Sequence, residues 1–138
     1  MTIRSSSQAR AAKAKGRSWE QAVADHLTKH GWHAERRRLT GVEDCGDISG
    51  LPGVVIECKN EKRVDLAGWL DELLRERINA DRRWPKDMPH IGAVLVRRRG
   101  TTDTKAAYVV MDFDELVWLL QSGGWGPKIA SGGDRGEV

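Results

Sequence analysis

The sequence predicts a single α/β or α+β domain in which helices cover both faces of a mixed central sheet. Val54–Lys59 and Ile91–Val96 are short apolar runs rich in β-branched residues, which is typical of buried strands. Between them, the segment after Asp65 repeats apolar side chains at helical spacing. At 138 residues, the chain is long enough for one domain with its own core.

The two ends of the chain differ from its middle. Residues 1–16 are expected to form a flexible basic arm, since residues 1–17 hold five basic side chains and no acid. Residues 17–122 are expected to form the folded domain. Residues 123–138 hold six glycines and are expected to be a flexible tail.

The first half predicts one helix followed by three strands. Ser18 and Gln21 fit a capping box, and the helix is expected to run from Ser18 to a stop at Gly31. Residues 33–39 predict a strand, residues 40–46 a turn and residues 47–49 a short second strand. With Val54–Lys59, these segments predict an antiparallel meander.

The second half predicts a helix, two strands and a short helix. Asp65 is the expected N-cap of the longer helix, whose predicted apolar stripe comprises Leu66, Trp69, Leu70, Leu73, Leu74 and Ile78. Ile91–Val96 and residues 106–111 predict strands. Residues 113–121 predict the last helix, with Asp112 and Glu115 spaced as in a capping box.

Composition limits the classes of protein to consider. No apolar run is long enough to span a bilayer and no signal peptide is visible. Cys45 and Cys58 lack the spacing of a zinc site, and a buried, reduced Cys58 thiol is expected, which favours a cytoplasmic setting. Net charge is only +3, but clusters at Arg36–Arg38 and Arg97–Arg99 suit a polyanion such as nucleic acid.

The candidate site lies around the strand Val54–Lys59. Side chains alternate along a strand, so Val55, Glu57 and Lys59 should share one face, while Val54, Ile56 and Cys58 share the other. Asp47 precedes this strand and offers a second carboxylate. Two carboxylates around one divalent cation, with a lysine beside them, suit metal-assisted phosphodiester hydrolysis; a structural ion pair is the alternative.

The expected metal ligands are Asp47, Glu57 and the backbone carbonyl of Cys58, which offer the hard oxygens that Mg²⁺ prefers. Lys59 would position the attacking water or stabilise charge in the transition state. Glu20 is a possible third carboxylate, although an acid in the first turn of a helix is also favoured by the helix dipole alone. Glu43 and Asp44 compete with Asp47 as ligands and rank below it, because they lie in a turn.

These residues resemble the PD-(D/E)XK nuclease superfamily, and more narrowly the archaeal-type Holliday junction resolvases. A basic Gly-x-x-x-Glu segment opens their first helix, as residues 15–20 do here. A Lys-His-Gly-aromatic turn matches residues 29–32, and an Arg-x-x-Gly before the aspartate matches residues 38–41. The E-x-K strand, a long helix and an apolar strand follow, so the resemblance covers residues 16–110.

The resemblance implies a restriction-endonuclease-like core in a homodimeric endonuclease that cuts four-way DNA junctions in recombination and repair. It implies Mg²⁺ as cofactor, with Mn²⁺ able to substitute, and Glu20, Asp47, Glu57 and Lys59 as the catalytic residues. A bacterial or phage-infected cytoplasm is the expected setting. The basic residues expected to bind DNA are Arg17, Arg36, Arg37, Arg38, Lys62 and Arg63.

Two alternatives remain open at this stage. The chain could be another PD-(D/E)XK DNA nuclease, one that nicks or cuts flaps and branches. It could also be a non-catalytic nucleic-acid-binding module of the same fold. Apolar surfaces near Ile91–Val96, residues 116–120 and Trp84 are the candidates for a dimer interface.

Overall fold

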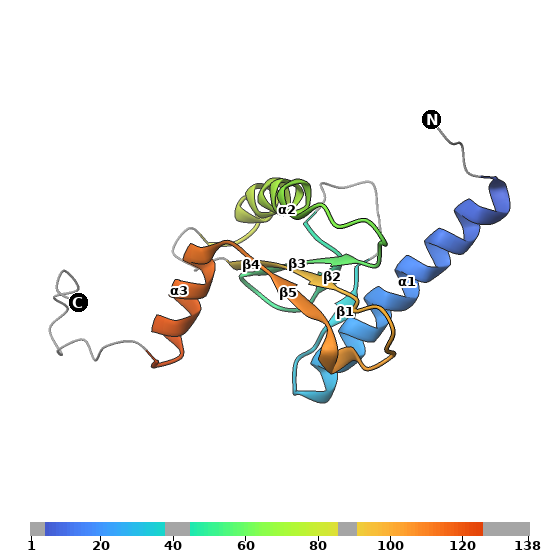
Figure 1. Ribbon diagram of the computed structural model, residues 1–138. Helices are drawn as coiled ribbons and strands as arrows, with labels where there is room; N and C mark the ends of the chain where they lie inside the picture. The colour runs from blue at the N-terminus through green and yellow to red at the C-terminus, as the bar shows by residue number, and fades with distance from the viewer. Residues whose placement is uncertain (1–4, 38–44, 86–90, 126–138) are drawn as a thin grey trace, which may run out of the picture.

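The computed structural model describes residues 5–37, 45–85 and 91–125. In this part of the chain the helices and strands follow one another in the predicted order, with one added 3₁₀ turn (Figure 1). The elements are α1 (Ser6–Lys29), β1 (Glu35–Arg36), β2 (Ile48–Ser49), β3 (Val54–Lys59), α2 (Leu66–Asp81), β4 (Ile91–Val96), η1 (Thr104–Ala106), β5 (Tyr108–Val110) and α3 (Phe113–Ser122). The fold is therefore mixed α and β, as predicted.

The strands form two small sheets. β3, β4 and β5 make a mixed sheet in which β4 is central, pairing parallel with β3 and antiparallel with β5. β1 and β2 form a separate antiparallel pair. The predicted meander is therefore wrong at its third strand, because β3 pairs with β4 rather than with β2. Its apolar run Val54–Val55–Ile56 is covered on both faces, which is typical of a parallel pair.

Helices cover the two faces of this sheet with separate cores. Trp19 and Val23 of α1 pack with Ile48 and Ile56 on one face. Trp69 and Leu73 of α2 pack with Val55 and Val94 on the other. The indole N–H of Trp19 donates to the carbonyl of Leu95 at 3.0 Å, which ties α1 to the middle of the sheet. The expectation of helices on both faces is confirmed.

Helix α1 begins well before the expected position. It starts at Ser6, and its capping box uses Ser5 and Gln8 instead of Ser18 and Gln21. Residues 6–16, expected to belong to a flexible arm, are helical and carry α1 beyond the sheet (Figure 1). The reason is composition: this segment is rich in Ala, Arg, Lys and Gln, which favour helix without any apolar face. The helix ends before Gly31, as predicted.

Helix α2 has the predicted N-cap but a different buried face. The Asp65 carboxylate accepts a hydrogen bond from the Gly68 N–H at 3.0 Å. Trp69 and Leu73 are buried as expected, whereas Leu66, Leu74 and Ile78 are about half exposed. The buried stripe continues instead through Glu76 and Ala80. The sheet therefore meets a face of α2 that includes a carboxylate.

The later elements need smaller corrections. β1 and β5 are shorter than predicted, and η1 occupies the region where the β5 strand was expected to begin. Asp112 precedes α3 but makes no capping hydrogen bond through its side chain. Cys58 is only half-buried, while Cys45 is buried, and these two cysteines do not form a disulfide. Of the expected tail, residues 126–138 lie outside the described part of the chain. No described helix is long and apolar enough to cross a membrane.

Candidate active site at the end of strand β3

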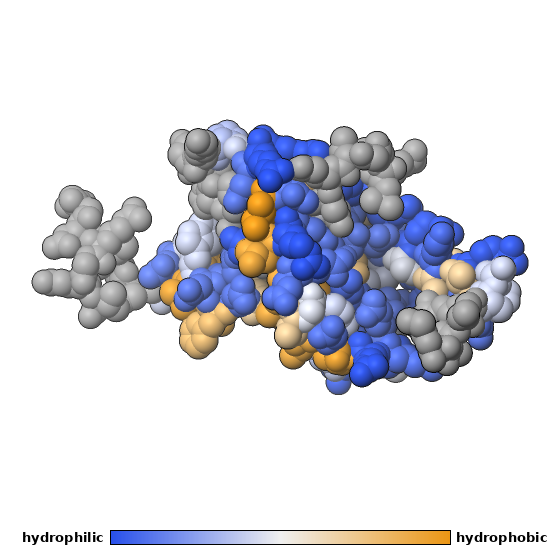
Figure 2. Space-filling view, turned by 90° about the horizontal axis from the view of Figure 1, so that it is seen from above, coloured by the Kyte–Doolittle hydropathy of each residue, from blue (hydrophilic) through white to orange (hydrophobic). Residues whose placement is uncertain are grey.

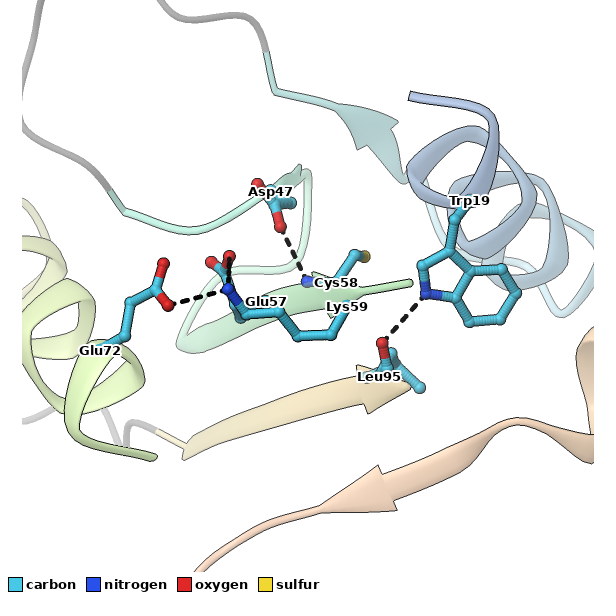
Figure 3. Close-up of polar contacts among 7 residues, drawn as sticks. All are labelled: Trp19, Asp47, Glu57, Cys58, Lys59, Glu72 and Leu95. Atoms are coloured by element: carbon cyan, nitrogen blue, oxygen red, sulfur yellow. Dashed lines mark hydrogen bonds and ion pairs between the residues drawn. The ribbon is translucent and has the colours of Figure 1, made fainter. Parts of the chain in front are cut away.

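Strand β3 presents two of the predicted site residues to α2. Val55 belongs to the core beneath α2, and Glu57 and Lys59 follow it on the same face, as the alternation predicts. The Lys59 ammonium lies 2.8 Å from a carboxylate oxygen of Glu72 on α2 and 3.6 Å from Glu57 Oε1. Figure 3 shows Lys59 between these two carboxylates.

Asp47 is held against the open edge of β3. Its backbone N–H donates to the Ile56 carbonyl at 2.8 Å, and its Oδ2 accepts from the Cys58 N–H at 2.7 Å (Figure 3). Gly46 makes this approach possible: its φ is 98°, and a Cβ there would lie 2.8 Å from the Ile56 carbonyl oxygen. A residue other than glycine would push Asp47 away from the strand.

The carbonyl of Cys58 points to the same edge as Asp47. The N–H and C=O of one strand residue share an edge, and the Cys58 N–H is bonded to Asp47. The Lys59 carbonyl points the other way and accepts from the Arg97 N–H beside β4. The predicted backbone ligand is therefore oriented toward the Asp47 carboxylate. Burial, together with the charge of Asp47, raises the pKa of the Cys58 thiol, which keeps it protonated.

Glu57 is the most deeply buried of the carboxylates predicted from the sequence. The residue is 6% exposed, and no donor in the described chain reaches its buried Oε2. Burial, the adjacent Glu76 carboxyl and the charge of Asp47 raise the pKa of Glu57 to about 12. A buried carboxylate that lacks compensating donors stays protonated or needs a cation.

Two acidic residues of α2 complete the cluster and were missed in the sequence. Carboxylate oxygens of Glu57, Glu72 and Glu76 all lie within 4.8 Å of one another, so these three residues could hold a metal ion. A signal for Glu76 was present. It falls three residues after Leu73 and seven after Trp69, on the apolar side of α2. An acid in an apolar stripe indicates a buried carboxylate.

Glu20 of α1 is also close enough to Asp47 to feel its charge. Burial, and after it the charge of Asp47, raises the pKa of Glu20 to about 7. The guanidinium of Arg36 lies 3.5 Å from Glu20 and opposes this rise. The charge of Asp47 thus raises the pKa of both Glu20 and Glu57.

Lys59 keeps its charge in this setting. Burial alone would lower its pKa, but the hydrogen bond to Glu72, together with the charge of that carboxylate, outweighs burial, and the net shift is upward. The ammonium is therefore available as a donor at neutral pH. Glu72 positions it by accepting one of its three hydrogens.

The predicted DNA-binding residues fall into two groups. Lys62 and Arg63 are exposed and line a hollow of ≈ 610 Å³ together with Lys59 and, from α1, Lys15. Arg17 is exposed on α1, and Arg36 and Arg37 are half-buried, with Arg36 paired to Glu20. Arg38 and the competing acids Glu43 and Asp44 lie outside the described residues.

The site thus joins four carboxylates, a lysine and a backbone carbonyl from β3, α2 and the segment before β2, with Glu20 of α1 alongside. The comparisons add no relative: no family model, curated protein or solved structure matches this chain.

Proposed function

We propose that the chain is a metal-dependent DNA endonuclease of the PD-(D/E)XK type, with a restriction-endonuclease-like core, that cuts four-way junctions. The observation that carries the nuclease assignment is the convergence of Asp47, Glu57 and Lys59 at the end of β3, beneath an acidic face of α2. The branched substrate is inferred from the resemblance and from the basic surfaces beside the site.

The donor set fits a hard divalent cation. Asp47, Glu57 and the Cys58 carbonyl offer oxygen ligands, and Mg²⁺, or Mn²⁺ in its place, would be held by them. The buried Glu57 Oε2, which has no donor among the described residues, fits a cation at this position. A bound metal of this kind polarises the scissile phosphate and makes a bound water acidic.

The chain's own residues supply the rest of the chemistry. Lys59 donates hydrogen bonds to the non-bridging oxygens of the phosphate, where negative charge builds up during attack. Glu72 keeps the ammonium of Lys59 in place. Glu20, with its pKa near 7, can accept a proton from the attacking water at neutral pH.

A two-fold symmetric junction needs two such sites, so we also propose a homodimer. Leu66, Leu74 and Ile78 leave apolar surface exposed on α2, and Figure 2, which looks down on this helix, shows an apolar ridge between hydrophilic side chains. The exposed apolar residues of α3 are Phe113, Leu116, Val117, Trp118 and Leu120. Apolar surface of this kind on two helices is typical of an interaction face.

The test is cleavage of a synthetic four-way junction against a linear duplex of the same sequence, with Mg²⁺ and with EDTA. We expect Mg²⁺-dependent cuts in the junction, and none for Asp47→Asn, which keeps the shape of the side chain but loses its charge. Asp71→Asn is the matched control, since Asp71 is exposed on α2 next to Glu72. Cleavage that persists in EDTA, or in Asp47→Asn, would refute the site. Tight DNA binding without any cleavage would favour the non-catalytic module.

A further inference from the structure

The turn after β4 carries three consecutive arginines that the proposed active site does not use. Arg97, Arg98 and Arg99, with Gly100, Thr101, Thr102 and Asn60, line a hollow of ≈ 540 Å³. None of these lining residues is acidic. Arg98 and Arg99 are exposed, and the guanidinium carbon of Arg98 lies 5.8 Å from the centre of the Tyr108 ring. The hollow is therefore a concentrated positive surface at the end of the parallel strand pair.

This hollow adjoins the active site directly. β3 and β4 run parallel with Lys59 opposite Val96, so both strands end at the same edge of the sheet. The Arg97 N–H donates to the Lys59 carbonyl at 2.9 Å. Asn60, which follows Lys59, lines this hollow and also the one formed with Lys15, Lys62 and Arg63. The two hollows thus meet at a residue next to the catalytic lysine.

The turn is built to hold its shape. Gly100 has a φ of 82°, a conformation that glycine adopts without strain. The Asp103 N–H donates to Thr101 Oγ1 at 3.0 Å, and Asp103 Oδ1 accepts from the Lys105 N–H at 3.1 Å. In Figure 1 the connection from β4 to β5 lies beside α1. A fixed turn presents its arginines at less conformational cost than a mobile one.

We propose that the Arg97–Thr102 turn with Asn60 is a second backbone subsite, which binds the DNA strand where it leaves the active site. This inference rests on the proposed function for its substrate. Guanidinium groups bind phosphate oxygens through paired N–H donors, and threonine hydroxyls and the asparagine amide add neutral donors. Contacts of this class position the strand and carry no sequence preference. The subsite fits DNA backbone on a path that runs from Lys62 and Arg63 past Asn60 to the arginine turn.

The salt dependence of binding tests this subsite without relying on cleavage. Affinity for a four-way DNA junction is measured in EDTA between about 50 and 200 mM salt. The logarithm of the binding constant is plotted against the logarithm of the salt concentration, and each lost phosphate contact lowers the magnitude of the slope by about 0.9. The triple variant Arg97→Gln, Arg98→Gln, Arg99→Gln should bind more weakly, with a slope lower by about 2.7 if all three contacts are lost.

The matched control removes the same charge elsewhere. Lys29, Arg75 and Arg83 are exposed and line neither hollow, and their triple substitution to Gln should leave the slope near that of the wild type. Equal losses in both triple variants would show a general charge effect and overturn the subsite, as would an unchanged slope in the arginine variant. If the triple variant does not fold, the exposed pair Arg98→Gln, Arg99→Gln is measured in the same way.

Methylphosphonate substitution locates the contacts. Neutral phosphates placed one at a time beside the scissile position should weaken wild-type binding at a defined set of positions. The arginine variant should be insensitive at those positions only. Equal sensitivity of the two proteins at every position would overturn the subsite, and tighter binding of a four-way RNA junction would overturn the assignment to DNA. If the slope changes as expected but the protein never cleaves DNA, the proposed nuclease function is refuted and the proposed subsite is still supported.

Discussion

Replacing Glu57 with Gln should make the metal-free protein more stable at neutral pH while abolishing metal-dependent cleavage. Glu57 is buried beside Glu76 and near Asp47, and its pKa is raised from the ordinary 4.5 to about 12. The Glu57 carboxyl therefore keeps its proton at neutral pH in the folded protein and loses that proton in the unfolded chain. Because the folded pKa is the higher one, stability is fully present below pH 4.5 and falls as the pH rises toward the folded value.

The loss of stability at neutral pH depends on the pKa of Glu57 in the unfolded chain. It does not depend on how far the pKa of Glu57 in the folded protein lies above neutrality. At about pH 7.5 the unfolded carboxyl is about three pH units above its pKa, and at about 1.36 kcal/mol per unit the folded state is penalised by about 4 kcal/mol. At about pH 5 the same penalty is only about 1 kcal/mol. Gln cannot ionise, so the gain from Glu57→Gln should grow by about 3 kcal/mol between these two pH values.

Urea unfolding in EDTA at several pH values between about 5 and 7.5 measures this difference. The fixed cost or benefit of the new amide cancels, because only the change with pH is compared. Asp71→Asn serves as the control and should leave the pH profile parallel to that of the wild type. Saturating Mg²⁺ should narrow the difference at about pH 7.5, because a metal at about a hundred times its Kd stabilises the wild type by about 2.7 kcal/mol, whereas the variant lacks one of the metal ligands.

Parallel pH profiles for the wild type and Glu57→Gln would refute this reasoning. They would mean that Glu57 is ionised in the metal-free fold, with Lys59 at 3.6 Å as its counterion. The same result would weaken the case for a cation at Glu57 Oε2, because the carboxylate would already be neutralised by its neighbour.

Three further predictions concern single side chains. Lys59→Ala should lower the rate of junction cleavage by about 10²-fold or more, with junction affinity nearly unchanged, if the ammonium stabilises the transition state. Glu20→Ala should reduce cleavage and remove a pKa near 7 from the pH–rate profile; normal cleavage with an unaltered profile would return Glu20 to a purely structural role. Gly16→Ala should raise the free energy of unfolding by about 0.5–1 kcal/mol in urea, since a Cβ there meets no atom within 4 Å and alanine favours helix; a loss of stability would contradict this.

The sequence was most informative where local rules also determine the three-dimensional contacts. β3 could be predicted from its β-branched run, and the shared face of Glu57 and Lys59 follows from strand geometry alone. The N-cap at Asp65 was equally local, because a carboxylate three residues before an amide at a helix start is a short-range pattern. Such features need no knowledge of the partner elements.

Pairing and burial were harder, because they depend on elements far apart in sequence. The continuous apolar run of β3 suits a strand that is covered on both faces, but it does not identify β4 as the partner, and the meander prediction failed. The apolar positions of α2 allow two overlapping stripes, one through Leu66, Leu74 and Ile78 and one through Trp69, Leu73 and Glu76. Burial of a glutamate is disfavoured in isolation, which is why the predicted stripe joined both sets of apolar residues and left out Glu76.

That disfavoured choice is itself an argument about function. A helix with an alternative apolar face could have packed leucines on the sheet, yet α2 directs Glu76 and Glu72 toward Glu57 and leaves Leu66, Leu74 and Ile78 half exposed. Both features destabilise an isolated, metal-free protomer. A divalent cation between the carboxylates would remove the first cost, and a second copy or another protein packed on the exposed apolar side chains would remove the second. Buried carboxylates and exposed apolar side chains both depart from the usual preferences of folded proteins. Departures that occur together indicate a functional site, and here they occur around β3 and α2.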